Sequence, residues 1–339
     1  MLNSNKTYII AELSANHAGN KEIALKTVRK AKEVGADAIK LQTFLPETMT
    51  LDIDTEIFMA NPEGPWKGIK LFDLYKKAML PWKWHKDIFS LAKELDIDCF
   101  SSPFDLSSVE FLEQFSPPAY KIASLEITDI PLIKKCAETG KPIIISTGAA
   151  RIEDIDLAVK TCKDSGNNQI TLLKCTSAYP TPYNEVNLKQ IQSLRNRYNL
   201  PIGLSDHTLG IEVPIASVVI GAKIIEKHFI LSKEIDSPDK DFSLEPQEFK
   251  QMVDAIRNVE QAIGNGNFTP SKKSLSAMKI RRSLFVSKDI KKGETFTKEN
   301  IKSIRPGLGL HPKYYYEILG KTAKQDIDKA EPLSWDLIK

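Results

Sequence analysis

The sequence has little histidine and little cysteine, with five and four residues among 339. The cysteines, at positions 99, 136, 162 and 175, show no CxxC spacing, which argues against a zinc knuckle or a disulfide framework and favours reduced thiols. Long hydrophobic runs are also missing, and the first twenty residues reach an acidic side chain after only four or five apolar positions, too few for a signal peptide. We therefore expect a cytoplasmic protein with no membrane partner.

Blocks of positive charge are absent as well. The formal net charge is +3, and lysines and arginines are spread along the chain, so we expect no nucleic-acid partner. No GxGxxG motif follows the first apolar run, which disfavours a doubly wound dinucleotide-binding sheet. With 27% charged and 42% hydrophobic residues, the composition is that of an ordinary globular protein, and the length favours one large domain and one small one.

Short apolar or β-branched runs alternate with segments that repeat apolar residues every three or four positions. There are eight such runs, at residues 8–13, 38–43, 99–103, 119–124, 142–147, 170–176, 202–207 and 224–229. Strands that alternate with helices form parallel sheets through right-handed crossovers, and eight units match the closed (β/α)₈ barrel. A doubly wound open sheet is the alternative.

The predicted barrel domain covers residues 1–267. The interval between its second and third runs is long, and residues 44–68 have weak periodicity, so we predict a long loop on the active side. A polar linker is predicted at residues 268–282. Short strand and turn patterns then predict a small, mostly β domain at residues 283–339.

Polar side chains crowd the carboxyl ends of the eight runs, whereas the starts of the runs show nothing comparable. In a parallel barrel these ends meet at one rim, where active sites lie. Any one of these residues alone is more simply interpreted as solvated or structural, but their convergence predicts a site. The candidates are Glu12, Asn16, His17, Lys40, Gln42, Ser102, Lys121, Ser124, Glu126, Ser146, Ser177, Tyr179, Asp206, His207, Glu226 and His228.

His207 and His228 end adjacent predicted strands, which lie about 5 Å apart, so both imidazoles can reach one metal ion. Two protein ligands leave positions open for water or substrate, and Mn²⁺, Mg²⁺, Co²⁺ and Zn²⁺ all suit nitrogen and oxygen ligands. Asp206 and Glu226, beside the histidines, either share the site or orient its ligands.

Lys40 and Lys121 end the second and fourth runs among several serines, including Ser102, Ser124 and Ser146. Ammonium and hydroxyl groups that face one cavity suit a phosphate and a carboxylate. A Schiff-base lysine is the competing interpretation. For acid and base catalysis the candidates are Glu12 and, in "SPDKDFSLEP", Asp239.

The ordered motifs resemble those of the sialic acid synthase family over nearly the whole chain. They are "IIAELSANHAG", "AIKLQT", "FSSPFD", "PAYKIASLEI", "PIIISTGAA", "LLKCTSAYPTP", "GLSDHTLG", "IIEKHF" and "FSLEP", followed by "RRSLFVSKDIKKGETFT" and "IRPGLGL". The last two are similar to the antifreeze-like (SAF) domain of that family. Such enzymes condense phosphoenolpyruvate with an acetamido sugar and water, releasing phosphate and a nine-carbon 2-keto acid. The resemblance is greatest to the pseudaminic branch, whose sugar is 2,4-diacetamido-2,4,6-trideoxy-L-altrose.

The resemblance also implies residue roles. His207 and His228 would hold a divalent metal, with Mn²⁺ expected and Mg²⁺ or Co²⁺ as alternatives, while Glu12 and Asp239 would handle protons. The substrate-binding positions would be Lys40, Gln42, Ser102, Lys121, Ser124, Glu126, Ser146, Ser177, Tyr179 and Phe229. Arg305, in "IRPGLG", matches an arginine that reaches the sugar from the SAF domain of the other subunit, so a homodimer with exchanged SAF domains is expected.

Three alternatives remain open. The loop with Asp239 lacks the glycine pair usual in the family, so a manno-configured sugar, as in N-acetylneuraminate or legionaminate synthesis, is one alternative. The second is a Schiff-base aldolase that uses Lys121 or Lys40. The third is a catalytically silent sugar-binding protein.

Overall fold

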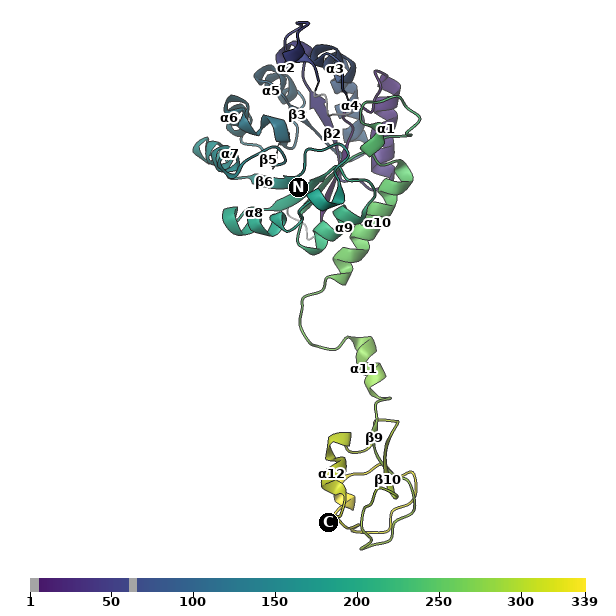
Figure 1. The fold of residues 1–339 in the computed structure, drawn as a ribbon. Helices are drawn as coiled ribbons and strands as arrows, with labels where there is room; N and C mark the ends of the chain where they lie inside the picture. Colours follow the sequence, from purple (N-terminus) through teal and green to yellow (C-terminus); the bar gives the residue numbers. More distant parts are fainter. Residues whose placement is uncertain (1–5, 61–65) are drawn as a thin grey trace. The chain divides into compact units, whose positions relative to one another are not determined.

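The computed structural model describes residues 6–60 and 66–339. The chain forms two compact units, Met1–Gly264 and Asn265–Lys339, which are considered separately (Figure 1). All four cysteines belong to the described part of the first unit, where they are buried and unpaired. Within the described ranges, no helix is both long and apolar enough to cross a membrane.

The first unit is a closed barrel of eight parallel strands in sequential order, in which β1 pairs with β8. The predicted (β/α)₈ fold is thus confirmed. The strands are β1 (Tyr8–Glu12), β2 (Ala38–Thr43), β3 (Asp98–Pro103), β4 (Tyr120–Ile122), β5 (Ile143–Ser146), β6 (Ile170–Cys175), β7 (Ile202–Asp206) and β8 (Ile224–His228). β4 is shorter than the predicted run, because the short 3₁₀ helix η3 (Ser124–Thr128) begins soon after it.

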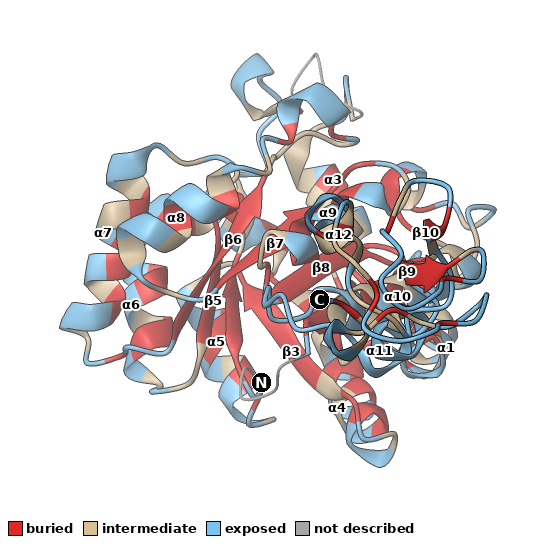
Figure 2. Cartoon of the chain, turned by 90° about the horizontal axis from the view of Figure 1, so that it is seen from below, coloured by how far each residue is buried: buried red, intermediate tan, exposed pale blue. Residues whose placement is uncertain are grey.

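Helices pack around the outside of the barrel and leave their outer faces exposed (Figure 2). They are α1 (Lys21–Glu33), α4 (His85–Glu94), α5 (Leu106–Glu113), α6 (Ile130–Glu138), α7 (Ile152–Asp164), α8 (Gln190–Tyr198), α9 (Glu212–Val219) and α10 (Pro246–Ala262). Several begin with a side-chain cap, as where Asn20 accepts from the backbone N–H of Glu22. Gly35 and Gly140 end helices with positive φ, as their positions after α1 and α6 predict.

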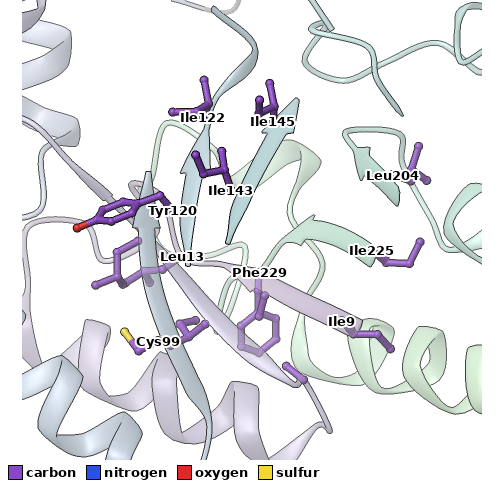
Figure 3. Close-up of a cluster of buried hydrophobic side chains, with 14 of the residues drawn as sticks. Ile9, Leu13, Cys99, Tyr120, Ile122, Ile143, Ile145, Leu204, Ile225 and Phe229 are labelled. Atoms are coloured by element: carbon purple, nitrogen blue, oxygen red, sulfur yellow. The ribbon is translucent and has the colours of Figure 1, made fainter. Parts of the chain in front are cut away.

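Successive residues of each strand point alternately out of the barrel and into it. The outward set packs on the helices and forms the main core, part of which Figure 3 shows around Ile9, Leu204 and Ile225. A second apolar cluster consists of inward-pointing residues and fills the barrel interior toward the amino ends of the strands. Its members are Tyr8, Ile10, Ala38, Phe100, Ile144, Leu173 and Ile224. The inward-pointing polar side chains therefore gather toward the carboxyl ends of the strands.

The segment between β2 and β3 carries α2 (Pro46–Met49), η1 (Glu56–Phe58), α3 (Leu71–Ala78) and η2 (Trp82–Trp84). The predicted long loop therefore contains two short helical turns, and residues 61–65 of it lie outside the described residues. Between η1 and α3, Met59 and Lys70 form an antiparallel bridge, and Ala60 N donates a hydrogen bond to Ile69 O at 2.9 Å.

The second unit has its own apolar core, built around Leu284, Phe296 and Ile301. Its antiparallel strands β9 (Ser283–Val286) and β10 (Ile301–Ile304) are accompanied by η6 (Pro312–Tyr314), α12 (Tyr315–Ile318) and η7 (Trp335–Leu337). α11 (Lys272–Met278) lies within the predicted linker, 268–282.

Arg257 of α10 fastens the start of the barrel to its last helix. Its guanidinium donates to Asp37 Oδ2 at 2.9 Å and to Thr7 O at 2.7 Å, and the same Asp37 oxygen accepts from Ile9 N at 2.8 Å. Arg257→Ala leaves these acceptors without their donor, so we expect the free energy of unfolding to fall by about 1–3 kcal/mol in urea titrations. Lys250→Ala, which removes an exposed pair on the same helix, should cause no measurable change. Equal stabilities of the two variants would contradict this role.

Candidate active site

Ionisable and hydroxyl side chains converge inside the barrel at the carboxyl ends of the strands. Those that end or follow the strands on the inner face are nearly inaccessible to solvent. They include Glu12, Lys40, Ser102, Lys121, Ser146, Cys175, Ser205, His207, Glu226 and His228. The structure therefore brings together side chains that are more than 200 residues apart in the sequence.

Two lysines and two glutamates form the centre of this cluster. Lys40 Nζ lies 2.5 Å from Glu12 Oε2 and 3.7 Å from Glu226 Oε1, and Lys121 Nζ lies 3.8 Å from the same Glu226 oxygen. Lys40 also donates to Ser102 Oγ at 3.1 Å. Glu12 Oε1 and Glu226 Oε2 are buried and have no hydrogen-bond partner among the described residues. The cluster thus retains unused polar atoms.

Burial and neighbouring charge set the protonation states of these groups. Burial raises the pKa of Glu12 to about 7, although Lys40 opposes this. Burial would also raise the pKa of Glu226, but the adjacent Lys121 and Lys40 hold that pKa below its ordinary value. The pKa of Lys121 is lowered, chiefly by burial, while Glu12 and Glu226 raise that of Lys40 in spite of its burial. Glu226 is therefore the permanent anion, and Glu12 titrates near neutrality.

A set of hydroxyl groups lies next to the lysines around Gly148. Ser124 Oγ accepts from Gly148 N at 3.1 Å. Ser146 Oγ and Ser177 Oγ are buried without a partner in the described chain. A Cβ atom at Gly148 would lie 2.6 Å from Ser177 Oγ and 2.9 Å from Ser124 Oγ, so no side chain fits there. The result is a compact group of hydroxyl donors, of a kind suited to the oxygens of an anion.

His207 and His228 lie side by side, with ring centroids 5.4 Å apart. Nδ1 of His207 is 3.0 Å from Thr176 O, which fixes the proton on Nδ1 and leaves the lone pair on Nε2. Nδ1 of His228 is buried without a hydrogen-bond partner in the described part of the chain, and it lies 3.7 Å from Asp239 Oδ2. Burial, together with the positive charges nearby, holds the pKa of His228 well below its ordinary value. Burial would lower the pKa of His207, but Cys175 and the Thr176 carbonyl raise it above its ordinary value. The His228 ring is therefore neutral, and His207 offers the lone pair of Nε2 when its ring is deprotonated.

The loop that carries Asp239 is held by the segment after β1. Asn16 accepts from Ser237 Oγ at 2.6 Å and donates to Ser243 Oγ at 2.8 Å, and Ser243 donates to Asp239 O at 2.6 Å. Asp239 Oδ2 accepts from Ala15 N at 3.4 Å, and burial raises the pKa of this carboxyl group. Asn16 is therefore a support for Asp239.

Three further candidates in the barrel unit lie apart from the cluster, and a fourth belongs to the second unit. Both ring nitrogens of His17 are engaged, by Ala78 O and by Gly19 N, and burial lowers its pKa to about 4. The Phe229 ring packs against that of Phe249 in the outer core, because the residue after the inward His228 must point outward. For the same reason Asp206 lies outside the barrel wall, whereas Glu226 points inward. Arg305 is exposed in the second unit.

The remaining candidates line the approach to the cluster. Gln42 is paired in register with Ser102, and Glu126 lies in η3, where burial raises its pKa to about 7. The ring of Tyr179 lies 4.3 Å from that of His207, measured between centroids. His85 is buried, and its Nε2 lies 2.8 Å from Thr43 Oγ1, so it has a structural role away from the cluster.

Three residues of the site region were missed by the sequence reasoning. Cys175 lies inside the barrel with Sγ 3.8 Å from His207 Nδ1, and Gly148 makes room for the hydroxyl groups. Trp66 reaches to 6.2 Å from Tyr179 between ring centroids, and its buried indole N–H has no partner among the described residues. The sequence signal available for Trp66 was a tryptophan between two glycines, in "EGPWKG".

A cavity of about 710 Å³ opens at the opposite end of the barrel, near Tyr8, Asp98 and Phe115. Tyr8 donates a hydrogen bond to Asp98 Oδ2 at 2.5 Å there. The cavity contains none of the lysines, serines or histidines described above. Chemistry in parallel barrels takes place at the carboxyl ends of the strands, so size alone does not make this cavity the site.

Fold and site together define an enzyme of the (β/α)₈-barrel class whose interior is equipped for an anionic substrate. Residues 27–268 match the NeuB family and residues 281–339 match the SAF domain. The chain belongs to the NeuB family, which confirms the resemblance to sialic acid synthases and the antifreeze-like C-terminal domain.

Individual relatives cover nearly the whole chain. It is 49% identical to a pseudaminic acid synthase of Campylobacter jejuni over 97% of this chain and 95% of the relative. It is 41% identical to an N,N'-diacetyllegionaminic acid synthase of the same species over 96% of this chain and 98% of the relative. Among solved structures, an N-acetylneuraminic acid synthetase from Leptospira borgpetersenii is similar with a TM-score of 0.71 and 32% identity, covering 81% of this chain and 91% of that one.

Proposed function

We propose that this chain condenses phosphoenolpyruvate with 2,4-diacetamido-2,4,6-trideoxy-L-altrose and water, forming pseudaminic acid and phosphate. The observation that carries the proposal is the presence of buried lysine and hydroxyl donors, among them Lys121 and Ser146, together with two adjacent imidazoles inside one barrel. The higher identity to a pseudaminic acid synthase than to a legionaminic acid synthase favours this sugar.

Phosphoenolpyruvate carries a phosphate and a carboxylate, and the cluster offers a partner for each. Lys40 and Lys121 supply positive charge, which Glu226 and, when it is deprotonated, Glu12 offset. The unpartnered hydroxyls of Ser146 and Ser177, with the N–H and hydroxyl donors around Gly148, would complete the site. Ser102, Ser124 and Gln42 would line the same pocket. Bound there, the enol carbon C3 would point toward the open end of the barrel, where the sugar enters.

A divalent metal fits the two imidazoles. Both can present a nitrogen lone pair, and the unpartnered Nδ1 of His228 is a buried polar atom that a cation would satisfy. No group of three or more His, Cys, Asp and Glu side chains in the described ranges is arranged to hold a metal, so water and substrate oxygens would supply the other ligands. We propose Mn²⁺, with Mg²⁺ or Co²⁺ as alternatives. A bound ion would supply polarisation of the sugar aldehyde.

The carboxyl groups would move the protons of the reaction. A bond forms between C3 of phosphoenolpyruvate and the aldehyde carbon, and the aldehyde oxygen takes a proton. Water adds to C2 and loses a proton, and cleavage of the C2–O bond then releases phosphate and leaves the ketone. Asp239, with its raised pKa and its position near His228, suits the acid. Glu12, which titrates near 7 beside Lys40, suits the base that takes the proton of the water.

Aromatic groups and the second unit would recognise the sugar. The Tyr179 ring lies between those of His207 and Trp66 in the contact chain, 4.3 Å from the first and 6.2 Å from the second between centroids. The indole N–H of Trp66, which has no partner among the described residues, can donate to an acetamido oxygen. Glu126, buried and unpartnered at Oε2 among the described residues, would line the same approach. We further propose a homodimer with exchanged SAF domains, in which the exposed Arg305 of each subunit reaches the sugar of the other.

The sugar assignment is tested by phosphate release with three acceptors. We expect release from phosphoenolpyruvate to depend on the altrose-derived sugar and on added Mn²⁺. N-acetylmannosamine and the diacetamido-mannose precursor of legionaminic acid should react at least about tenfold more slowly, since one misplaced acetamido contact costs about 1.4 kcal/mol or more. Equal or faster turnover with either manno-configured sugar would refute the pseudaminic assignment and leave the reaction class standing.

One observation favours a second candidate, a Schiff-base aldolase. Burial lowers the pKa of Lys121, which is the condition under which a lysine becomes a nucleophile. However, Lys121 Nζ donates to Ile122 O at 3.2 Å and lies near Glu226, an arrangement that holds it as a cation. Borohydride should therefore fail to trap a keto acid on Lys121. Covalent trapping there, with activity that survives a chelator, would establish the aldolase instead.

A further inference from the structure

A buried ion pair lies on the outer side of the barrel wall, directly behind the two imidazoles. Asp206 of β7 and Lys227 of β8 are partners in the strand register, and Lys227 Nζ lies 2.5 Å from Asp206 Oδ2. The two side chains are 2% and 0% exposed. They occupy the residues immediately before His207 and His228.

Lys227 forms hydrogen bonds with both chain neighbours of His207, which are Asp206 and Thr208. Besides its bond to Asp206, its ammonium group donates to the backbone carbonyl of Thr208. Thr208 is tied back to Asp206, since its N–H and its hydroxyl both donate to Asp206 Oδ1, at 3.2 and 3.0 Å. The three residues thus form a closed unit around the backbone of His207. Because Lys227 is covalently joined to His228, this unit links the two imidazoles through a few short bonds.

Stability does not explain why charge is placed here. The neighbouring outward residues on the same strands, Leu204 and Ile225, are apolar parts of the outer core (Figure 3). Taking two charges out of water is costly, and an apolar pair of similar volume is often as stable or more stable. What the ion pair adds is direction, because its bonds hold the ends of β7 and β8 at one spacing. Hydrogen-bonded partners of metal ligands commonly have this effect.

We propose that Asp206 and Lys227 are positioning residues that hold His207 and His228 at the spacing required to bind one divalent cation. This inference rests on the metal site of the proposed function. The two residues would thus affect metal affinity from the outer side of the barrel wall, without contact with the ion.

The test replaces the pair by apolar residues, Asp206→Leu with Lys227→Met, and measures Mn²⁺ affinity by calorimetry beside the thermal unfolding midpoint. We expect the midpoint of the double variant to equal or exceed that of the wild type, while Mn²⁺ binds about 10–100-fold more weakly. The affinity for phosphoenolpyruvate without metal should stay unchanged. Arg257→Met is the matched control, since it breaks an ion pair at the other end of the barrel and should lower the midpoint without changing Mn²⁺ affinity.

Unchanged Mn²⁺ affinity in a folded double variant would overturn the inference and leave the proposed function intact. If the double variant does not fold, Asp206→Asn decides, because it keeps the shape and an oxygen acceptor for Thr208 but removes the charge. It should bind Mn²⁺ about tenfold more weakly, and wild-type affinity would overturn the inference. A wild-type protein that bound no divalent cation would overturn the metal site of the proposed function, and this inference with it.

Discussion

Replacement of both His207 and His228 by alanine should lower kcat/KM by at least about a thousandfold and abolish the response to Mn²⁺. The reason is that loss of a cation from a developing alkoxide removes several kcal/mol of stabilisation, and each 1.4 kcal/mol is about tenfold in rate. The two rings lie 5.4 Å apart between centroids and have no other evident task for their free nitrogens. The measurement is phosphate release over a range of Mn²⁺ concentrations, with the metal content of each protein determined separately.

His311→Ala serves as the control, because that histidine is exposed in the second unit and should not affect the response to metal. Circular dichroism and the affinity for phosphoenolpyruvate should be unchanged in the double variant, since the lysine and serine donors do not depend on the imidazoles. An active, metal-indifferent double variant would exclude the mechanism proposed above.

The second large effect is expected at Glu12. Glu12→Gln should lower kcat by about a hundredfold to ten-thousandfold, the usual contribution of a general base. A base acts when it is deprotonated, so the wild-type rate should rise tenfold per pH unit below the pKa of about 7 and level off above it. The variant has no titrating group at this position and should therefore lose the rising limb. Profiles of log kcat/KM between pH 5 and 9 would report the pKa in the free enzyme, and kcat at saturating substrates would measure the loss of rate.

Glu126 provides the matched control for this assignment. Burial raises its pKa to about 7 as well, so it could produce the same rising limb if it were the base. Glu126→Gln should instead keep the limb and raise the KM for the sugar. A profile that loses its limb in Glu126→Gln and keeps it in Glu12→Gln would exchange the two roles.

Much of the fold followed from local pattern. Apolar runs of strand length that alternate with helical periodicity predict a parallel barrel, since each pattern is a property of neighbouring residues. The crowding of polar side chains at the ends of the runs predicted the end of the barrel at which the structure brings ionisable side chains together. Boundaries were less accurate where a 3₁₀ helix takes over, as at Ser124 after β4.

The composition of the site was only partly predictable. Whether a residue at the end of a strand points inward or outward depends on a parity that only the paired sheet defines, so Phe229 and Asp206 could not be separated from His228 and Glu226. Cys175 and Gly148 were overlooked because a buried thiol and a missing side chain have no distinctive pattern in one sequence. Asn16 and His17, which follow Glu12 by four and five residues, serve as supports because their side chains meet segments distant in the chain.

By itself the sequence determined the architecture, the end of the barrel at which ionisable side chains gather and the residue types available there. The reason is that hydrophobic periodicity and strand ends are properties of neighbouring residues. Only the tertiary structure decided which of those residues share one space. The ion pairs of Glu226 with Lys40 and Lys121 join strands far apart in the chain, and the ion pair of Asp206 with Lys227 depends on the register of two consecutive strands. Such contacts exist only in the folded barrel, because folding removes water from these groups and gives each of them its neighbours.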